Sequence, residues 1–269
     1  MKYKLTNEMK EVNEKKLYRI ESVSDFSNIK IGNKGGWIET EKNLSQSGEA
    51  WVYGNACVYG EACVYDNAEI SGEAWVYGKA RVSGEAWIYD NAEISDNARI
   101  SGKARVSGEA WVYGNACVYD NARISENARI SDNARIYDEA RISGNACVCD
   151  NANVYGNAVT YDEARISENA LVYENACVYG EARISGEAWV YGESIISGEA
   201  ICTKDPVTIV GLHYKVTITG NHIQIGCKIH TKEEWKSFTN KEIIAMDGKK
   251  SIEFWNKYKD FILKSVEGK

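Results

Sequence analysis

An uninterrupted series of six-residue repeats occupies the centre of the chain, from residue 48 to residue 203. Aligned in sixes, the 26 units read GEAWVY, GNACVY, GEACVY, DNAEIS and onward to GESIIS and GEAICT, with no inserted or deleted residue. The first position is Gly, Asp or Glu, the third is Ala in 25 of the 26 units, and the fifth is almost always Val or Ile. Internal repetition of this kind constrains the fold more than any other feature of a sequence.

Each unit is predicted to form one short strand followed by a corner. Positions 3 and 5 are apolar and two residues apart, so in an extended segment they point to one side while positions 4 and 6 point to the other. Positions 1 and 2 then form the corner, where Gly, and Asn at the second position, tolerate the left-handed backbone region. The presence of 23 Gly and a single Pro agrees with corners that need Gly and exclude Pro.

The pattern resembles the hexapeptide-repeat family of left-handed parallel β-helices, whose signature is an aliphatic residue followed four positions later by a small one. Val52 with Ala56 and Ile70 with Ala74 are examples. The resemblance implies three units per triangular coil, so the 26 units make between eight and nine coils, in a rod about 40 Å long. The expected fold is mainly β, with an N-terminal β cap over 1–47, a left-handed parallel β-helix over 48–203 and a C-terminal α+β cap over 204–269.

A coil of three units places residues 18 apart on one face, one above another. Position 6 of one face then carries a ladder of Tyr119, Tyr137, Tyr155, Tyr173 and Tyr191. Position 4 of a second face carries Arg105, Arg123 and Arg141, beside Ser107, Ser125 and Ser143 at position 6. The tyrosines are candidate binding residues for a protein, a sugar or a planar ligand, and the arginines for an anion.

Both ladders also have a purely structural interpretation, because identical side chains stacked along a solenoid stabilise one another. Tryptophan is expected at the same outward position 4 in five further units, at Trp51, Trp75, Trp87, Trp111 and Trp189.

The charge is divided sharply along the chain. Residues 48–203 carry 11 Lys and Arg against 24 Asp and Glu, a net charge of −13, whereas the flanks carry 21 against 15, a net charge of +6. An acidic surface repels phosphates, so direct nucleic-acid binding by the repeats is disfavoured. Corner acids such as Asp90, Glu109 and Glu126 are expected to neutralise the arginines. Together the acids would either imitate a nucleic-acid backbone against a host defence or nucleic-acid enzyme, or keep the solenoid soluble.

The best-known members of the hexapeptide-repeat family are acyltransferases, which use a histidine base and an extruded loop. The repeats contain no His and no inserted loop, so neither feature has a matching position, and we predict no catalytic residue and no cofactor. The three histidines are His213, His222 and His230. Alternation in the segment HIQIGCKIH places Cys227 on a core face and separates His222 from His230 by about 26 Å along one strand, which disfavours a metal site.

Both flanks are suited to cap the solenoid, whose ends would otherwise expose unpaired edges and apolar cross-sections. Residues 17–20 and 28–38 are predicted strands before the first repeat, and 207–210, 214–219 and 222–229 are predicted strands after the last, with a hairpin turn at Gly220 and Asn221. A capping box runs from Thr231 to Glu234. A helix over 251–264 is expected to pack against the last coil.

Segments YRI at 18–20, GGWIE at 35–39 and NHIQIGC at 221–227 are similar to those of hexapeptide-repeat proteins encoded by phages and prophages, which implies a host protein as partner. No apolar leader or membrane span is evident, and the cysteines within the repeats are expected to be free thiols in a reducing cytoplasm. The sequence therefore predicts a non-enzymatic scaffold that binds, blocks or sequesters a host protein. An acyltransferase-like enzyme and a structural or virion-associated protein are the alternatives, and a homodimer or homotrimer is left open.

Overall fold

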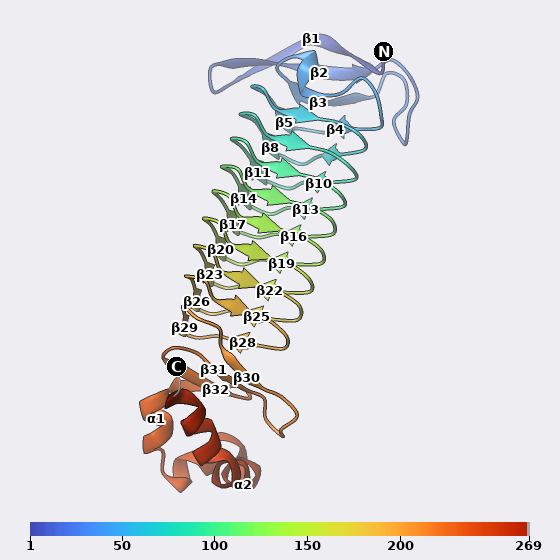
Figure 1. Cartoon of the computed structure of the whole chain (residues 1–269). Helices are drawn as coiled ribbons and strands as arrows, with labels where there is room; N and C mark the ends of the chain where they lie inside the picture. Colours follow the sequence, from blue (N-terminus) through green and yellow to red (C-terminus); the bar gives the residue numbers. More distant parts are fainter. Residues whose placement is uncertain (268–269) are drawn as a thin grey trace.

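The computed structural model describes residues 1–267 and shows a β-solenoid with a cap at each end (Figure 1). Each six-residue unit forms one two-residue strand from its fourth and fifth positions. The series begins with β4 (Trp51–Val52), β5 (Cys57–Val58) and β6 (Cys63–Val64), continues every six residues, and ends with β27 (Trp189–Val190), β28 (Ile195–Ile196) and β29 (Ile201–Cys202).

Every third strand joins the same parallel sheet, so the solenoid has three sheets. Nine repeat strands form the sheet from β5 to β29, nine the sheet from β4 to β28 and eight the sheet from β6 to β27. Paired residues are 18 apart, as in Arg105 with Arg123, and no insertion interrupts this register. The predicted parallel β-helix with between eight and nine coils is confirmed.

The corner of every unit is made by its first residue, which has a positive φ between 55° and 70° in all 26 units. The expectation that Asn at the second position supplies the left-handed conformation is wrong. The second residue is instead held by its backbone N–H, as Asn67 shows by donating to the carbonyl of Gly84 in the next coil at 2.9 Å. Gly adopts a positive φ without penalty, whereas Asp and Glu need compensation.

The compensation comes from the carboxylates of the corner acids. In eight of the 11 units that begin with Asp or Glu, the side chain accepts a hydrogen bond from the backbone N–H 18 residues later. Asp66 accepts from Gly84 at 3.1 Å and Glu126 accepts from Gly144 at 2.7 Å. These acids therefore join successive coils, a role that solubility alone would not require.

The core of the solenoid is a narrow column filled by the third and fifth side chains of each unit, all at most 2% exposed. One of these positions carries a buried hydroxyl. Thr160 takes a fifth position between Ile142 and Val178 and is 0% exposed, and its Oγ1 has no hydrogen-bond partner. A buried polar group without a partner is destabilising, because it has lost its bond to water.

We expect Thr160→Val to raise the free energy of unfolding by about 1 kcal/mol, because valine has nearly the same shape and no hydroxyl to desolvate. The midpoint of urea unfolding measures this change. The matched control is Val154→Thr, which places a hydroxyl in the equivalent buried position of the preceding unit and should lower the midpoint. A lower midpoint for Thr160→Val would show that the hydroxyl finds a partner in solution.

The N-terminal cap is a β-hairpin that extends one sheet of the solenoid. β1 (Tyr3–Val12) and β2 (Lys15–Ser22) pair antiparallel, and β3 (Lys34–Ile38) joins β2 to β5 before the short 3-10 helix η1 (Glu41–Asn43). The sequence missed β1 and the full length of β2. Trp51 occupies the outward position 4 in register with Glu69, as predicted, but the cap covers it: it is 1% exposed and packs its ring edgewise against Tyr3 and Phe26.

The N-terminal cap supplies hydrogen-bond donors. Between successive coils, the N–H groups of positions 4 and 6 donate to the carbonyls of positions 3 and 5 in the following coil, so these carbonyls of the first coil have no preceding coil to bond. The cap meets one such carbonyl in each sheet: Lys2 Nζ donates to Ala50 O at 2.7 Å, the Trp37 N–H to Ala56 O at 2.9 Å and Asn43 Nδ2 to Ala62 O at 2.9 Å. Burial of Lys2 lowers the pKa of its ammonium to about 8.

The C-terminal cap supplies hydrogen-bond acceptors, because the N–H groups that point away from the last coil have no further coil to bond. The last strand of each sheet has an N–H with no following coil, and a side chain from the cap accepts from it. Trp189 N–H donates to Asp205 Oδ1 at 2.9 Å, Ile195 N–H to Thr217 Oγ1 at 3.3 Å and Ile201 N–H to Asn221 Oδ1 at 2.8 Å. The N-terminal cap thus supplies donors for carbonyls of the first coil, and the C-terminal cap supplies acceptors for N–H groups of the last coil.

A four-stranded antiparallel sheet carries these acceptors. It contains β30 (Val207–Ile209), β31 (Val216–Ile218), β32 (His222–Ile225) and β33 (Lys228–Thr231), and is followed by α1 (Lys232–Ser237) and α2 (Asn240–Glu267), which is kinked at Asp247 and Gly248. The capping box of Thr231 and Glu234 is confirmed at the start of α1.

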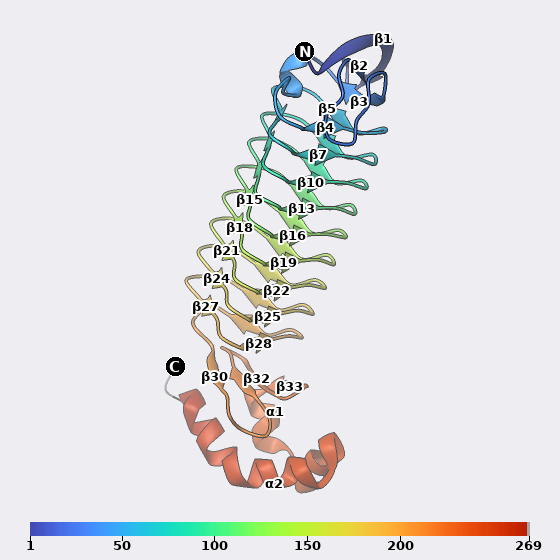
Figure 2. The ribbon, with the colours of Figure 1, turned by 90° about the vertical axis from the view of Figure 1, so that its right-hand side faces the viewer.

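The sheet, and not the helix, contacts the last coil (Figures 1 and 2). Ser194, the one exception to Ala at position 3, has its Oγ 2.7 Å from Thr208 Oγ1 in β30, and Ser197 Oγ donates to Gln224 Oε1 in β32 at 2.9 Å. Trp255 and Ile262 of α2 are buried in a second core shared with this sheet. The prediction that the helix packs against the coil is therefore wrong, because the sheet separates the two.

The segment HIQIGCKIH is a hairpin and not one strand. Gly226 has a φ of +58° and turns the chain between β32 and β33. Cys227 is consequently exposed at the turn, and His230 lies opposite Ile223 on the adjacent strand. The predicted core position of Cys227 and the 26 Å separation of the histidines are both wrong. Across residues 1–267, no helix is long and apolar enough to cross a membrane.

Candidate functional site

The five predicted tyrosines form a continuous stack, which we call the tyrosine strip: Tyr119, Tyr137, Tyr155, Tyr173 and Tyr191. Their ring centroids are 5.0, 4.7, 5.0 and 5.4 Å apart in that order. The first three pairs are within 4° of parallel and the last is tilted by 17°. The 18-residue arithmetic therefore placed these side chains correctly, while their role in binding stays a prediction.

The stacking limits which part of each tyrosine side chain is accessible to a binding partner. Both faces of Tyr137, Tyr155 and Tyr173 are covered by neighbouring rings, so the inner rings offer their edges and hydroxyl groups to solvent. Burial is the main cause that raises the pKa of Tyr137 to about 12, and it raises the pKa of Tyr119, Tyr155 and Tyr173 as well. At neutral pH these four phenols are uncharged and can both donate and accept hydrogen bonds.

Two aromatic side chains are well exposed at the C-terminal end of the strip. Tyr191 is 46% exposed, and Trp189, two residues before it, is 50% exposed. Trp189 pairs with the half-buried Leu171 of β24 (Leu171–Val172) in the same sheet. Exposed aromatic side chains are enriched in protein-binding surfaces.

The predicted arginine ladder is also present. Arg105, Arg123 and Arg141 are exposed and directly paired on β13 (Arg105–Val106), β16 (Arg123–Ile124) and β19 (Arg141–Ile142). A corner separates Arg123 from Tyr119, so the two ladders lie on adjacent faces and do not form one site.

The corner acids make no direct ion pair with these arginines in the described residues, and their expected neutralising effect stays a prediction. Asp90 accepts from the Gly108 N–H at 3.2 Å and Glu126 from Gly144, and over residues 1–267 no ion pair joins the three arginines to an acid. Arg105 instead lies 4.9 Å from the ring centroid of Trp87, which is 45% exposed. The guanidinium groups of the ladder are therefore not held by a carboxylate in direct contact.

Sequence reasoning missed a pocket in the C-terminal cap. It has a volume of about 240 Å³ and lies between the four-stranded sheet and the kinked α2, with a mainly apolar lining that includes Ile225, Trp235, Phe254 and Trp255. Tyr214 donates a hydrogen bond to Asp247 at its edge, which raises the pKa of Tyr214 to about 12. These residues are scattered over 42 positions without periodicity, so only the fold brings them together.

The fold and these surfaces define the class of the protein as a capped parallel β-solenoid. A family model described as the YdcK beta solenoid repeat matches residues 92–108 and 98–114, which lie within the coils. The match covers a small part of the chain and supports a repeat β-helix architecture. No curated protein matches the sequence.

Proposed function

We propose that this protein is a non-enzymatic binding scaffold whose tyrosine strip, together with Leu171 and Trp189, contacts a partner protein. The observation that carries the proposal is the stack itself. Five aligned phenol rings form one row, four of them half-buried and Tyr191 exposed, and Trp189, two residues before Tyr191, is 50% exposed. Tyrosine and tryptophan are the residues that most often dominate the energy of protein interfaces.

The stacking geometry favours a protein over a sugar or a planar ligand. Such ligands bind to the open face of an aromatic ring, and the faces of the three inner rings are already occupied. A protein can instead contact ring edges and hydroxyl groups along the length of the strip. A rigid solenoid also loses little conformational entropy when it binds, because its side chains are already ordered.

The resemblance to phage-encoded hexapeptide-repeat proteins suggests that the partner is a host protein, which the scaffold would block or sequester. The acidic-rod alternative has less support. Eight of the corner acids are already used to hold backbone N–H groups, so their carboxylates are less free to imitate phosphates.

The test replaces Tyr137, Tyr155 and Tyr173 by Ser, the residue that many units already have at position 6. Proteins captured from a bacterial lysate are identified by mass spectrometry, and the affinity of a purified candidate is then measured. We expect the triple variant to weaken that affinity by more than tenfold. The matched control, Tyr161→Ser with Tyr179→Ser, breaks a two-ring stack at another corner and should leave binding unchanged. Equal binding by wild type and triple variant would exclude the strip.

A further inference from the structure

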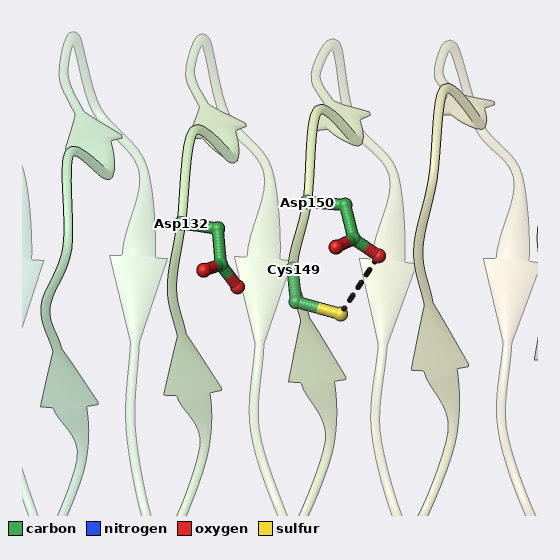
Figure 3. Close-up of side chains that lie close together, drawn as sticks. All are labelled: Asp132, Cys149 and Asp150. Carbon is green, nitrogen blue, oxygen red and sulfur yellow. Dashed lines mark hydrogen bonds between the residues drawn. The ribbon is translucent and has the colours of Figure 1, made fainter.

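Polar side chains gather on the solenoid surface at Asp132, Cys149 and Asp150, and one polar atom of each lies within 4.8 Å of the others (Figure 3). Their hydrogen bonds stay within the coils. Cys149 Sγ donates to Asp150 Oδ2 at 3.6 Å, Asp150 also accepts from the Glu168 N–H at 3.0 Å, and Asp132 accepts from Ser131 Oγ at 2.8 Å. These bonds account for the group as part of the coil structure, and we assign it no ligand.

The pocket in the C-terminal cap differs from this group, because mainly apolar walls surround a space of about 240 Å³. Trp235, Phe254 and Trp255, which are at most 6% exposed, form part of these walls. An apolar cavity of about 150 Å³ can hold a benzene molecule, whereas pockets for drug-sized molecules begin at about 300 Å³. The pocket therefore has room for one aromatic or branched aliphatic group with a short polar extension.

The kink of α2 shapes one wall of the pocket and is fixed by hydrogen bonds. Gly248 has a φ of +66°, a conformation that favours glycine, and turns the chain between the two arms of α2. Ser251 Oγ lies 2.5 Å from Ile243 O and 2.8 Å from Gly248 O, so it joins the two arms. Tyr214 donates to Asp247 and thereby ties the kink to the segment before β31. A pocket held in this way needs little rearrangement to accept a ligand, which lowers the entropy cost of binding.

Two side chains of opposite charge belong to the lining, Asp247 at the kink and Lys228 at the start of β33. Both are exposed, and within residues 1–267 neither forms an ion pair. A carboxylate offers about four lone-pair sites, of which the Tyr214 hydroxyl uses one, and a lysine ammonium offers three donors. The pocket thus presents an acceptor for a cation and a donor for an anion beside an apolar interior.

We propose that this pocket binds a free α-amino acid with an apolar side chain. The side chain of the ligand packs against Trp235 and Phe254, its ammonium bonds to Asp247 and its carboxylate bonds to Lys228. A ligand with a single charge leaves one of the two charged groups unmatched and is repelled by it. All lining residues lie between 214 and 255, so the inference does not rest on the tyrosine strip.

Calorimetric titration of the full chain with three probes of similar shape tests the proposal. L-phenylalanine carries both charges, 2-phenylethylamine lacks the carboxylate and 3-phenylpropanoate lacks the ammonium. We expect L-phenylalanine to bind with a dissociation constant of about 10 µM to 1 mM, and each probe with one charge to bind at least tenfold more weakly. Binding of L-leucine or L-methionine in place of L-phenylalanine would keep the class of ligand and reduce only its size. Equal affinity of the three probes, or no binding of any of these amino acids at millimolar concentration, would overturn the proposal.

Two variants assign the charges to their residues. Asp247→Asn keeps an oxygen that can accept from Tyr214 but removes the charge, so it should weaken L-phenylalanine and 2-phenylethylamine at least fivefold and leave 3-phenylpropanoate no weaker. Lys228→Gln should weaken L-phenylalanine and 3-phenylpropanoate and leave 2-phenylethylamine no weaker. The matched controls Asp260→Asn and Lys250→Gln change exposed charges of α2 outside the lining and should alter each affinity by less than twofold. Equal effects of each variant and its control would reduce the interaction to long-range charge and overturn the proposal.

Discussion

A chain that ends at Lys204 is expected to self-associate, because it lacks the cap that closes the last coil. The truncation removes Asp205, Thr217 and Asn221, whose side chains accept from the last N–H group of the three sheets. It also exposes the apolar cross-section of the core at Ile196 and Ala200, which are each 1% exposed in the full chain. An open parallel edge with an apolar centre is a template for another solenoid.

Light scattering coupled to size-exclusion chromatography measures this effect, and we expect large or heterogeneous species in place of the species formed by the full chain. The milder variant Asn221→Ala removes one acceptor and leaves the sheet in place. It should leave the molar mass unchanged and lower the stability by about 1 kcal/mol, or up to about 3 kcal/mol if no water replaces the acceptor. A truncated chain with the molar mass and far-ultraviolet spectrum of an intact solenoid would contradict the prediction.

The replacement Ile166→Ala is expected to destabilise the solenoid by about 2–5 kcal/mol, because it removes a fully buried side chain from a column that cannot collapse around the gap. Ile166 belongs to β23 (Arg165–Ile166), is 0% exposed, and pairs with Val148 and Ile184 in the coils before and after it. The backbone hydrogen bonds between coils hold the spacing of the strands, so the neighbouring side chains have little freedom to fill the space.

The control lies one residue away. Arg165→Ala changes the outward side chain of the same strand and should alter the stability by no more than about 0.5 kcal/mol. Urea unfolding gives the difference between the variants. Hydrogen exchange should show the loss of protection strongest in the adjacent coils, because each repeat contacts mainly its neighbours. Equal effects of the two replacements would contradict the proposed division between core and surface.

The positions of the tyrosine strip and the arginine ladder could be predicted from the sequence, because both recur every 18 residues. Because no residue is inserted between 48 and 203, counting by 18 identified both the tyrosine strip and the arginine ladder. The repeat period alone does not show that the tyrosine rings cover one another's faces. It also does not show that Asp90 accepts a hydrogen bond from a backbone N–H, or that Arg105 lies over the ring of Trp87.

The sequence by itself determined the solenoid: its strands, its coils, and which side chains point inward. Those properties follow from local alternation and a constant period, so neighbouring residues suffice to specify them. Only the tertiary structure decided how the two ends close, that the hairpin turns at Gly226, that α2 packs on a sheet and not on the coil, and that Trp51 is buried. These features depend on contacts between the caps and the coils, and the sequences of the caps do not follow the six-residue repeat. Each cap is positioned in part by the backbone groups that its end of the solenoid leaves unpaired, carbonyls at the first coil and N–H groups at the last.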